Sequence, residues 1–211
     1  MPNACTGLVV TCHSMAVLRG IVMGGLYARD PTPRYPLAGL ILSSLGTRPV
    51  VHDQTPSVDN TTSSNSSTPP PAEMYFPTEV KRDLMFSEAK WKCVDPALAP
   101  LLEVQSTCIL LEELVDLRTQ WATYRASYSQ DVEVPILYVH GERDWLWEAS
   151  KETLAEFAAL FPKCPKFDTS LMLDAPHALE WSEVGQGWYA RCFGFAVEVC
   201  GSQGIRNLVK L

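Results

Sequence analysis

The stretch Gly7-Leu8-Val9-Val10-Thr11-Cys12-His13-Ser14-Met15-Ala16 decides the fold of this chain. Its first five residues form a short apolar run rich in β-branched side chains, which predicts a buried strand. Apolar residues then recur at helical spacing from Ala16 to Arg29, and this pattern stops at Asp30-Pro31, because proline cannot continue a helix. Ser14 therefore lies where a predicted strand turns sharply into a predicted helix.

Further strands and helices alternate along the rest of the sequence. Apolar runs at Pro36 to Ser44, Val134 to Gly141 and Thr169 to Leu173 predict three more strands, the first of which is expected to be buried. An amphipathic helix is expected from Glu148 to Phe161, and a closing helix from Gly187 to about Cys200. Strand, helix and parallel strand form βαβ units, which belong to sheets covered on both faces. The sequence thus predicts an α/β fold with a mostly parallel sheet flanked by helices.

The length of 211 residues fits a single domain, residues 1–211. Residues 53–72 contain no aromatic side chain and end in Pro69-Pro70-Pro71 with Ala72, so we expect a flexible Ser/Thr/Pro-rich loop there. Residues 78–130 show mostly helical spacing. Since they lie between two predicted strands of the sheet, we expect a helical lid inserted within the domain.

The charge of the chain limits its partners. The formal net charge is −7 and the basic residues are scattered, which argues against binding to nucleic acid or to an anionic membrane surface. No apolar stretch approaches the roughly 20 residues of a membrane span, and the N-terminus lacks the pattern of a secretory signal. We expect a cytoplasmic protein, although the final Val209-Lys210-Leu211 weakly resembles a peroxisomal address.

The cysteines and histidines do not suggest a metal or a cofactor. The seven cysteines are spread over the chain without a Cys-x-x-Cys pair, so we interpret them as reduced thiols. No spacing of four ligands typical of a metal site and no Gly-rich phosphate loop after a strand is present. We therefore expect no cofactor, and the sequence leaves the oligomeric state open.

Three residues suggest nucleophilic catalysis. A serine between a strand and a helix is the arrangement of a nucleophile elbow, in which the free N–H groups of the helix stabilise a developing oxyanion. Serine needs a histidine base, and that histidine needs a carboxylate to orient it. Asp144 follows the strand that ends at Gly141, and His177 follows the last predicted strand. Ser14, Asp144 and His177 are thus the predicted nucleophile, acid and base.

Other interpretations of these residues remain open. Ser14 could cap the helix that follows it, and Asp144 could be a turn or capping residue, with Glu142 as a rival for the acid. His140 ends a buried strand and is expected to be a core histidine with its hydrogen bonds satisfied, whereas His13 could border the site. The aromatic residues near these positions could line an acyl pocket or serve in packing. They are Trp145, Trp147, Trp181, Trp188 and Tyr189.

The sequence resembles microbial, especially fungal, α/β-hydrolases, many of which lie beside polyketide or toxin pathways. The resemblance covers about Gly7 to Cys200. It rests on Val134 to Tyr138, Gly141-Glu142-Arg143-Asp144, Ala175-Pro176-His177 and the closing Gly187 to Phe195. It implies a partial α/β-hydrolase fold with a catalytic triad of Ser14, Asp144 and His177. It also implies that Met15 supplies one N–H of the oxyanion hole.

Two departures from this family are visible. The usual elbow is Gly-x-Ser-x-Gly, whereas here Cys12 and Ala16 take the glycine positions, so we expect a slightly displaced site. A full domain also has several strands before the nucleophile, one of which provides the second oxyanion donor, but only six residues precede Gly7. We therefore expect that this chain lacks the N-terminal strands, associates or dissolves poorly, and has little esterase activity.

The predicted function is that of a serine hydrolase. Ser14 would attack an ester or thioester of a small acyl or natural-product substrate, and water would then hydrolyse the acyl-enzyme. One alternative is a non-hydrolytic biosynthetic enzyme on the same fold, such as a cyclase or a lyase. The other is a catalytically inactive, truncated remnant.

Overall fold

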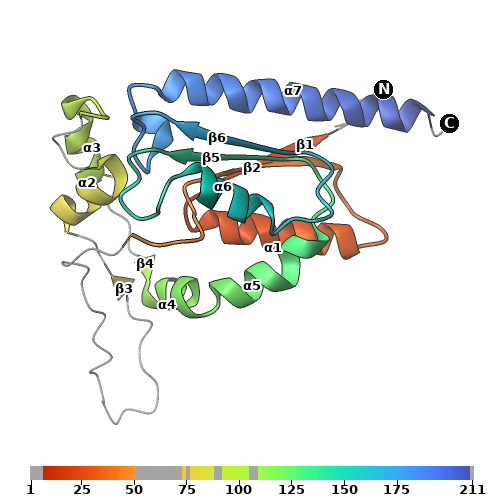
Figure 1. The fold of residues 1–211 in the computed structure, drawn as a ribbon, viewed down its shortest axis with the longest axis horizontal. Coiled ribbons are helices and arrows are strands. Elements are labelled where there is room, and N and C mark those ends of the chain that lie inside the picture. The colour runs from red at the N-terminus through yellow and green to blue at the C-terminus, as the bar shows by residue number, and fades with distance from the viewer. Residues whose placement is uncertain (1–6, 51–72, 75–76, 88–91, 105–108, 210–211) are drawn as a thin grey trace, which may run out of the picture.

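The computed structural model describes residues 7–50, 73–74, 77–87, 92–104 and 109–209 of the chain. Its central sheet has parallel strands in the order β1-β2-β5-β6 (Figure 1). These strands are β1 (Leu8–His13), β2 (Leu37–Ser43), β5 (Ile136–Gly141) and β6 (Phe167–Met172). The predicted α/β fold is confirmed, and each of the predicted strands is present.

The central strands are buried and the outer ones are not. Every residue of β2 and β5 is buried, as expected for strands that helices cover on both faces. Most residues of β1 and β6, the outer strands of the described sheet, are partly buried or exposed, so the prediction that the first strand is buried is wrong. Side chains of β2 alternate between the faces, because Leu40 and Leu42 join one hydrophobic core and Ile41 joins the other.

Helices cover both faces of the sheet. On one face lie α1 (Ala16–Arg29) and α6 (Lys151–Ala158), and on the other lies the long helix α7 (Gly185–Val209) (Figure 1). Residues at helical spacing, Trp188, Phe195 and Val199, pack α7 against the sheet. No helix in the described part of the chain is both long enough and apolar enough to cross a bilayer.

Two helices differ in length from the prediction. Helix α6 is shorter than expected at both ends. At its start, the Ser150 side chain accepts the N–H of Thr153 and the Thr153 side chain accepts the N–H of Ser150. This reciprocal capping box stops the helix from starting at Glu148. Helix α7 is longer than the predicted Gly187 to Cys200.

The segment between β2 and β5 is helical but interrupted. It contains α2 (Thr78–Phe86), α3 (Ala99–Val104), α4 (Leu111–Thr119) and α5 (Trp121–Tyr128). A two-residue strand β3 (Glu73–Met74) pairs antiparallel with β4 (Ile109–Leu110), which separates α3 from α4. Helix α5 packs along α1, and Trp121 enters the core beneath it. The predicted flexible loop, residues 53–72, lies outside the described residues.

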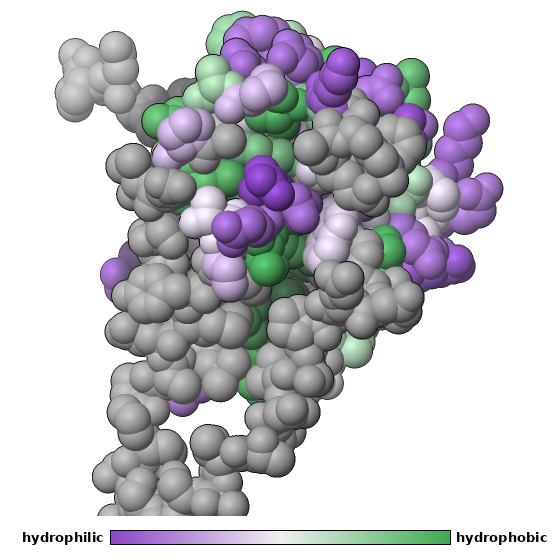
Figure 2. Space-filling view, turned by 90° about the vertical axis from the view of Figure 1, so that its left-hand side faces the viewer, coloured by the Kyte–Doolittle hydropathy of each residue, from purple (hydrophilic) through white to green (hydrophobic). Residues whose placement is uncertain are grey.

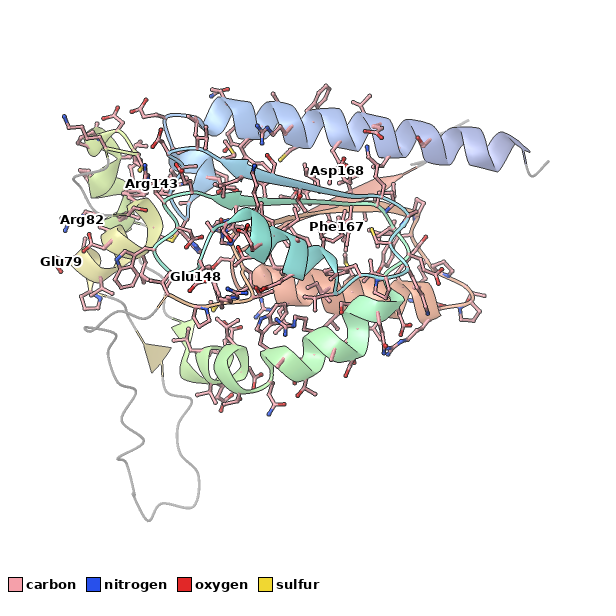
Figure 3. All side chains as sticks on the ribbon, viewed as in Figure 1. Glu79, Arg82, Arg143, Glu148, Phe167 and Asp168 are labelled. Atoms are coloured by element: carbon pink, nitrogen blue, oxygen red, sulfur yellow. The ribbon has the colours of Figure 1, made fainter. Side chains whose placement is uncertain are left out.

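Helices α2 and α3 lie at the end of the sheet toward which the parallel strands run. Phe86, Val94 and Leu102 form a small core there with Ala178, the residue after His177. Arg143, in the loop after β5, lies at this same end of the molecule as Glu79 and Arg82 of α2 (Figure 3). A view onto this end shows hydrophilic residues near its centre next to hydrophobic ones (Figure 2). In an open parallel sheet, sites form at this edge.

Candidate active site

The predicted elbow is formed at the end of β1. Ser14 follows His13, the last residue of the strand, and has a φ of 54°, a left-handed conformation that is uncommon for residues other than glycine. Its N–H donates to the carbonyl oxygen of Ser43 in the neighbouring strand β2, at 2.8 Å. Helix α1 begins two residues later, at Ala16. This strained turn is the conformation that presents a serine hydroxyl above a sheet edge.

Ser14, His177 and Asp144 form one continuous chain of hydrogen bonds. The Oγ of Ser14 lies 2.9 Å from Nε2 of His177, and Nδ1 of the same ring lies 2.9 Å from Oδ2 of Asp144. These distances fit two hydrogen bonds, in which the Ser14 hydroxyl donates to Nε2 and the Nδ1–H donates to the Asp144 carboxylate. His177 and Asp144 are buried, with exposed fractions of 1% and 8%. The fold thus brings together the three residues that the sequence predicts.

The Asp144 carboxylate is held on both of its oxygens. Oδ2 faces His177, while Oδ1 accepts the N–H groups of Leu146 at 2.8 Å and Trp147 at 3.2 Å. Burial opposes the charged form, but the charge and hydrogen bond of His177, with the N–H of Leu146, hold the pKa of Asp144 below its usual value. An ionised, fixed carboxylate is what a histidine base requires.

The rival acid, Glu142, points elsewhere. Its carboxylate accepts the N–H of Asp174 at 3.1 Å and lies 3.8 Å from the Arg143 guanidinium. It therefore ties the loop after β5 to the loop after β6, whereas Asp144 makes the hydrogen bond to His177.

His13 borders the site, as predicted. Its ring lies 5.0 Å from that of His177, edge to face, and its Nδ1 lies 3.0 Å from Oγ of Ser43. Burial, followed by the nearby His177, lowers the pKa of His13 to about 3, so its ring is neutral at pH 7. A neutral imidazole beside His177 avoids repulsion of the imidazolium that would form there.

His140 is a core residue, but the prediction that its hydrogen bonds are satisfied is wrong. The side chain is 1% exposed, and neither ring nitrogen has a hydrogen-bond partner in the described structure. Its Nε2 lies 3.9 Å from Oδ2 of Asp144, too far for a hydrogen bond, because His177 occupies that oxygen. Burial lowers the pKa of His140 to about 4.

Met15 is the residue before helix α1, and its backbone N–H has no hydrogen-bond partner within the described residues. A free N–H directly after Ser14 is available to an oxyanion. Among the described residues, no group of three or more His, Cys, Asp or Glu side chains is arranged to hold a metal ion.

The aromatic residues mainly serve packing. Trp188, on the sheet-facing side of α7, is 1% exposed, and its Nε1–H donates to Glu180 at 3.0 Å. Trp181 packs against Phe86 of α2, with ring centroids 5.5 Å apart. Tyr189 is half exposed on α7.

Sequence reasoning missed Ser43 and Ser44, whose only signal is a pair of hydroxyls that ends an otherwise apolar strand.

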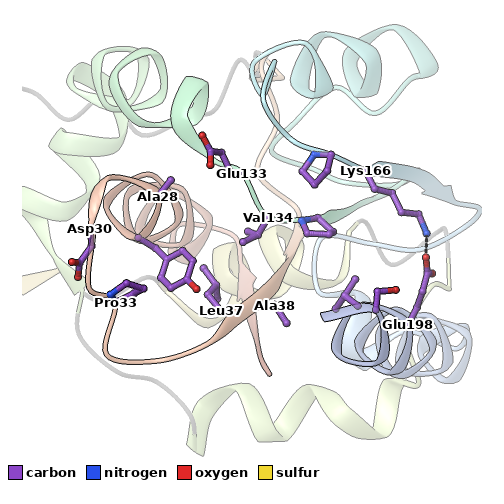
Figure 4. A pocket seen from close by; sticks show the side chains of 14 residues that line it. Ala28, Asp30, Pro33, Leu37, Ala38, Glu133, Val134, Lys166 and Glu198 are labelled. Atoms are coloured by element: carbon purple, nitrogen blue, oxygen red, sulfur yellow. Dashed lines mark hydrogen bonds and ion pairs between the residues drawn. The ribbon is translucent and has the colours of Figure 1, made fainter. Parts of the chain in front are cut away.

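A cavity of about 460 Å³ lies at the opposite end of the sheet (Figure 4). Its lining includes Leu37 at the start of β2, Val134 before β5 and Lys166 before β6, with the Lys166–Glu198 ion pair at its rim. Parallel strands place their starts and ends at opposite edges, so this cavity is separate from the Ser14 site.

The arrangement of sheet and helices is that of part of the α/β-hydrolase fold. A monoacylglycerol lipase from Paleococcus ferrophilus matches with a TM-score of 0.62 and 13% identity, over 90% of this chain and 68% of that chain. A soluble variant of the monoglyceride lipase of Saccharomyces cerevisiae, bound to a substrate analogue, matches with a TM-score of 0.53 and 14% identity, over 89% and 60%. A variant of tomato methylketone synthase I bound to β-ketoheptanoate matches with a TM-score of 0.56 and 11% identity, over 94% and 73%.

These identities are low, so the likeness establishes the fold. The chain spans about two thirds of the length of these solved chains. A scan against models of protein families finds no match, and a comparison with curated protein sequences finds none either.

Proposed function

We propose that this chain carries the catalytic centre of a serine hydrolase that cleaves esters or thioesters of small acyl or natural-product compounds. The observation that carries the proposal is the hydrogen-bonded series Ser14–His177–Asp144, with Ser14 in the left-handed conformation of an elbow. A nucleophile, a base in contact with it and a carboxylate that orients the base are the parts that acyl transfer needs.

In the proposed reaction, Ser14 Oγ attacks the carbonyl carbon of the substrate while its proton moves to Nε2 of His177. The negative charge that develops on the carbonyl oxygen is stabilised by the Met15 N–H. The tetrahedral intermediate then expels the alcohol or thiol, which takes the proton from His177. A water molecule, deprotonated by His177, attacks the acyl-enzyme, and the carboxylic acid leaves as the proton returns to Ser14 Oγ.

Asp144 acts through His177. Its carboxylate accepts Nδ1–H, so Nε2 is left unprotonated and free to take the proton of Ser14. Its low pKa keeps it charged, which stabilises the imidazolium formed during the reaction.

The helices between β2 and β5 are proposed as the lid of this site. Three contacts support this role. The N–H of Ala178 donates to the carbonyl of Met85 at 2.9 Å, Phe86 packs on Trp181, and the Ser87 hydroxyl donates to the carbonyl of Arg143. Helix α2 therefore contacts the loops that carry both Asp144 and His177, so its movement would reach the site.

A non-hydrolytic enzyme is the second candidate, and the methylketone synthase neighbour is the observation in its favour. A synthase on this fold shows that the scaffold is compatible with other chemistry. Product analysis separates the two candidates, because hydrolysis yields a free acid together with an alcohol or thiol.

A fluorophosphonate probe tests the proposal directly. It should label the wild-type chain, and Ser14→Ala should abolish the labelling because the nucleophile is lost. His177→Ala should slow labelling strongly, while Ser129→Ala, which removes a buried hydroxyl that donates to the carbonyl of Arg125 away from the site, should leave it unchanged. Labelling that persists in Ser14→Ala would exclude Ser14 as the nucleophile.

A further inference from the structure

Strand β2 ends at Ser43. Ser43 and the next residue, Ser44, contact the main chains of the proposed nucleophile and base. Strand β2 is the direct neighbour of β1, and the carbonyl oxygen of Ser43 accepts the N–H of Ser14 at 2.8 Å. The hydroxyl of Ser44 donates to the carbonyl oxygen of His177 at 2.7 Å. Two adjacent residues thus hold the main chains of the proposed nucleophile and base, which are 163 positions apart.

Ser44 adopts an unfavourable backbone conformation to make this contact. Its φ is 57°, in the left-handed region, where glycine is free of strain and other residues are not. The residue is fully buried, and its own N–H donates to the carbonyl of Val139 at 3.2 Å. A glycine would relieve the strain but would lose the hydroxyl. The strained serine therefore indicates that the hydroxyl has a task that the turn alone does not require.

We propose that Ser44 is a positioning residue for His177, an inference that rests on the proposed function of the triad. Its hydroxyl donates to the His177 main chain, while the carbonyl of the adjacent residue, Ser43, accepts the N–H of Ser14. One short, buried segment of β2 thus contributes to setting the distance between Ser14 Oγ and His177 Nε2, beside the contacts that tie the His177 loop to the loop after β5 and to helix α2. The other hydrogen bond to the His177 carbonyl comes from the N–H of Leu179 at 3.1 Å, which moves with the same loop and cannot fix it to the sheet.

The test compares Ser44→Ala, Ser44→Gly and the control Ser129→Ala. Ser129 is likewise a buried serine whose hydroxyl donates to a main-chain carbonyl, that of Arg125, away from the site. Both Ser44 variants should lower the rate of fluorophosphonate labelling and kcat by about tenfold or more with little change in KM, because a small displacement of the base slows proton transfer. Ser44→Gly should be at least as stable as Ser44→Ala, since glycine tolerates the positive φ.

A second measurement does not depend on turnover. The proton between Nδ1 of His177 and Asp144 should give a downfield resonance in the NMR spectrum of the wild type. That resonance should broaden or shift in both Ser44 variants and stay unchanged in Ser129→Ala. A purely structural role of Ser44 would lower stability without moving this signal.

The outcomes separate the two proposals. Normal labelling and an unchanged resonance in both Ser44 variants would overturn the positioning role while leaving the hydrolase proposal intact. If the wild type is not labelled at all, the hydrolase proposal fails, and the resonance alone decides whether Ser44 positions His177. Full activity of Ser44→Gly with loss only in Ser44→Ala would assign the effect to the backbone and reject the role of the hydroxyl.

Discussion

Cys12 and Gly20 fit against each other beneath the elbow: a Cβ atom on Gly20 would lie only 2.7 Å from Sγ of Cys12. Cys12 takes the position where the usual elbow has glycine, and its thiol needs room on the side of α1. Gly20 in α1 provides that room. Ser14 therefore keeps its left-handed conformation and lies within 2.9 Å of His177, although the residue two positions before it is not glycine.

This pairing predicts strong coupling between the two positions. Gly20→Ala alone should destabilise the chain by about 1–2 kcal/mol, because overpacking against Sγ outweighs the better helix propensity of alanine. In the Cys12→Gly background the same substitution should become neutral or stabilising. Urea unfolding of the double-mutant cycle should give a coupling energy above about 1 kcal/mol, whereas additive effects would show that Cys12 and Gly20 do not compete for space.

Gly141 should be intolerant of any side chain. A Cβ there would lie 2.3 Å from the carbonyl oxygen of Pro176 and 2.5 Å from that of Ala175, in the loop that carries His177. Gly141→Ala should therefore displace this loop and lower kcat by about a hundredfold. Gly187→Ala is the matched control, since no atom of the described residues outside its own stretch of α7 lies within 4 Å of the added Cβ. Equal activity of the two variants, measured with a p-nitrophenyl ester, would contradict the prediction.

Asp144→Asn tests the acid. Asparagine has nearly the same shape, but its amide can donate to Nδ1 and so favour the tautomer with a protonated Nε2, which cannot accept the proton of Ser14. We expect a fall in kcat of about 10⁴-fold, as for a serine hydrolase that loses its triad carboxylate. Glu142→Gln, at the rival position, should retain activity because its oxygen can still accept the Asp174 N–H. A large loss in Glu142→Gln alone would reverse the assignment.

His140 should make the fold sensitive to acid. Burial lowers its pKa to about 4 from an ordinary 6.5, so between these values the unfolded chain binds a proton that the folded chain does not. The contribution of His140 to the free energy of unfolding is therefore complete above about pH 6.5 and is lost as the pH falls toward 4. The total loss is roughly 3 kcal/mol at most, and the contribution changes little below pH 4. The carboxylate of Asp144 and the ring of His177 face His140 and act on its pKa in opposite directions.

The variant His140→Phe removes this contribution. Its free energy of unfolding should vary less between pH 6.5 and 4 than that of the wild type, while His13, with a pKa lowered to about 3, acts in both proteins. At pH 7 the variant should be at least as stable, because two buried nitrogens without partners are removed. Parallel pH profiles from chemical unfolding would show that His140 does not titrate in this window.

Much of the site could be predicted because its residues follow strands. Ser14, Asp144 and His177 each come shortly after an apolar run, and the ends of parallel strands meet at one edge. The missing hydrogen bonds of the His140 ring could not be predicted, because they depend on the hydrogen bond between His177 and Oδ2 of Asp144. The break between α3 and α4 was missed for a similar reason, since β4 exists only by pairing with the distant β3.

The sequence by itself determined the four strands of the sheet, the helices that flank them and the residue types of the predicted triad, because hydrophobic periodicity and turn residues act over short distances along the chain. Only the tertiary structure decided that Asp144 and not Glu142 contacts His177, that Gly20 makes room for Cys12, and that Ser44 contacts the His177 main chain. These relationships join residues that are distant in the chain or lie on different elements. Their geometry arises from close packing and hydrogen-bond direction, which no local pattern encodes.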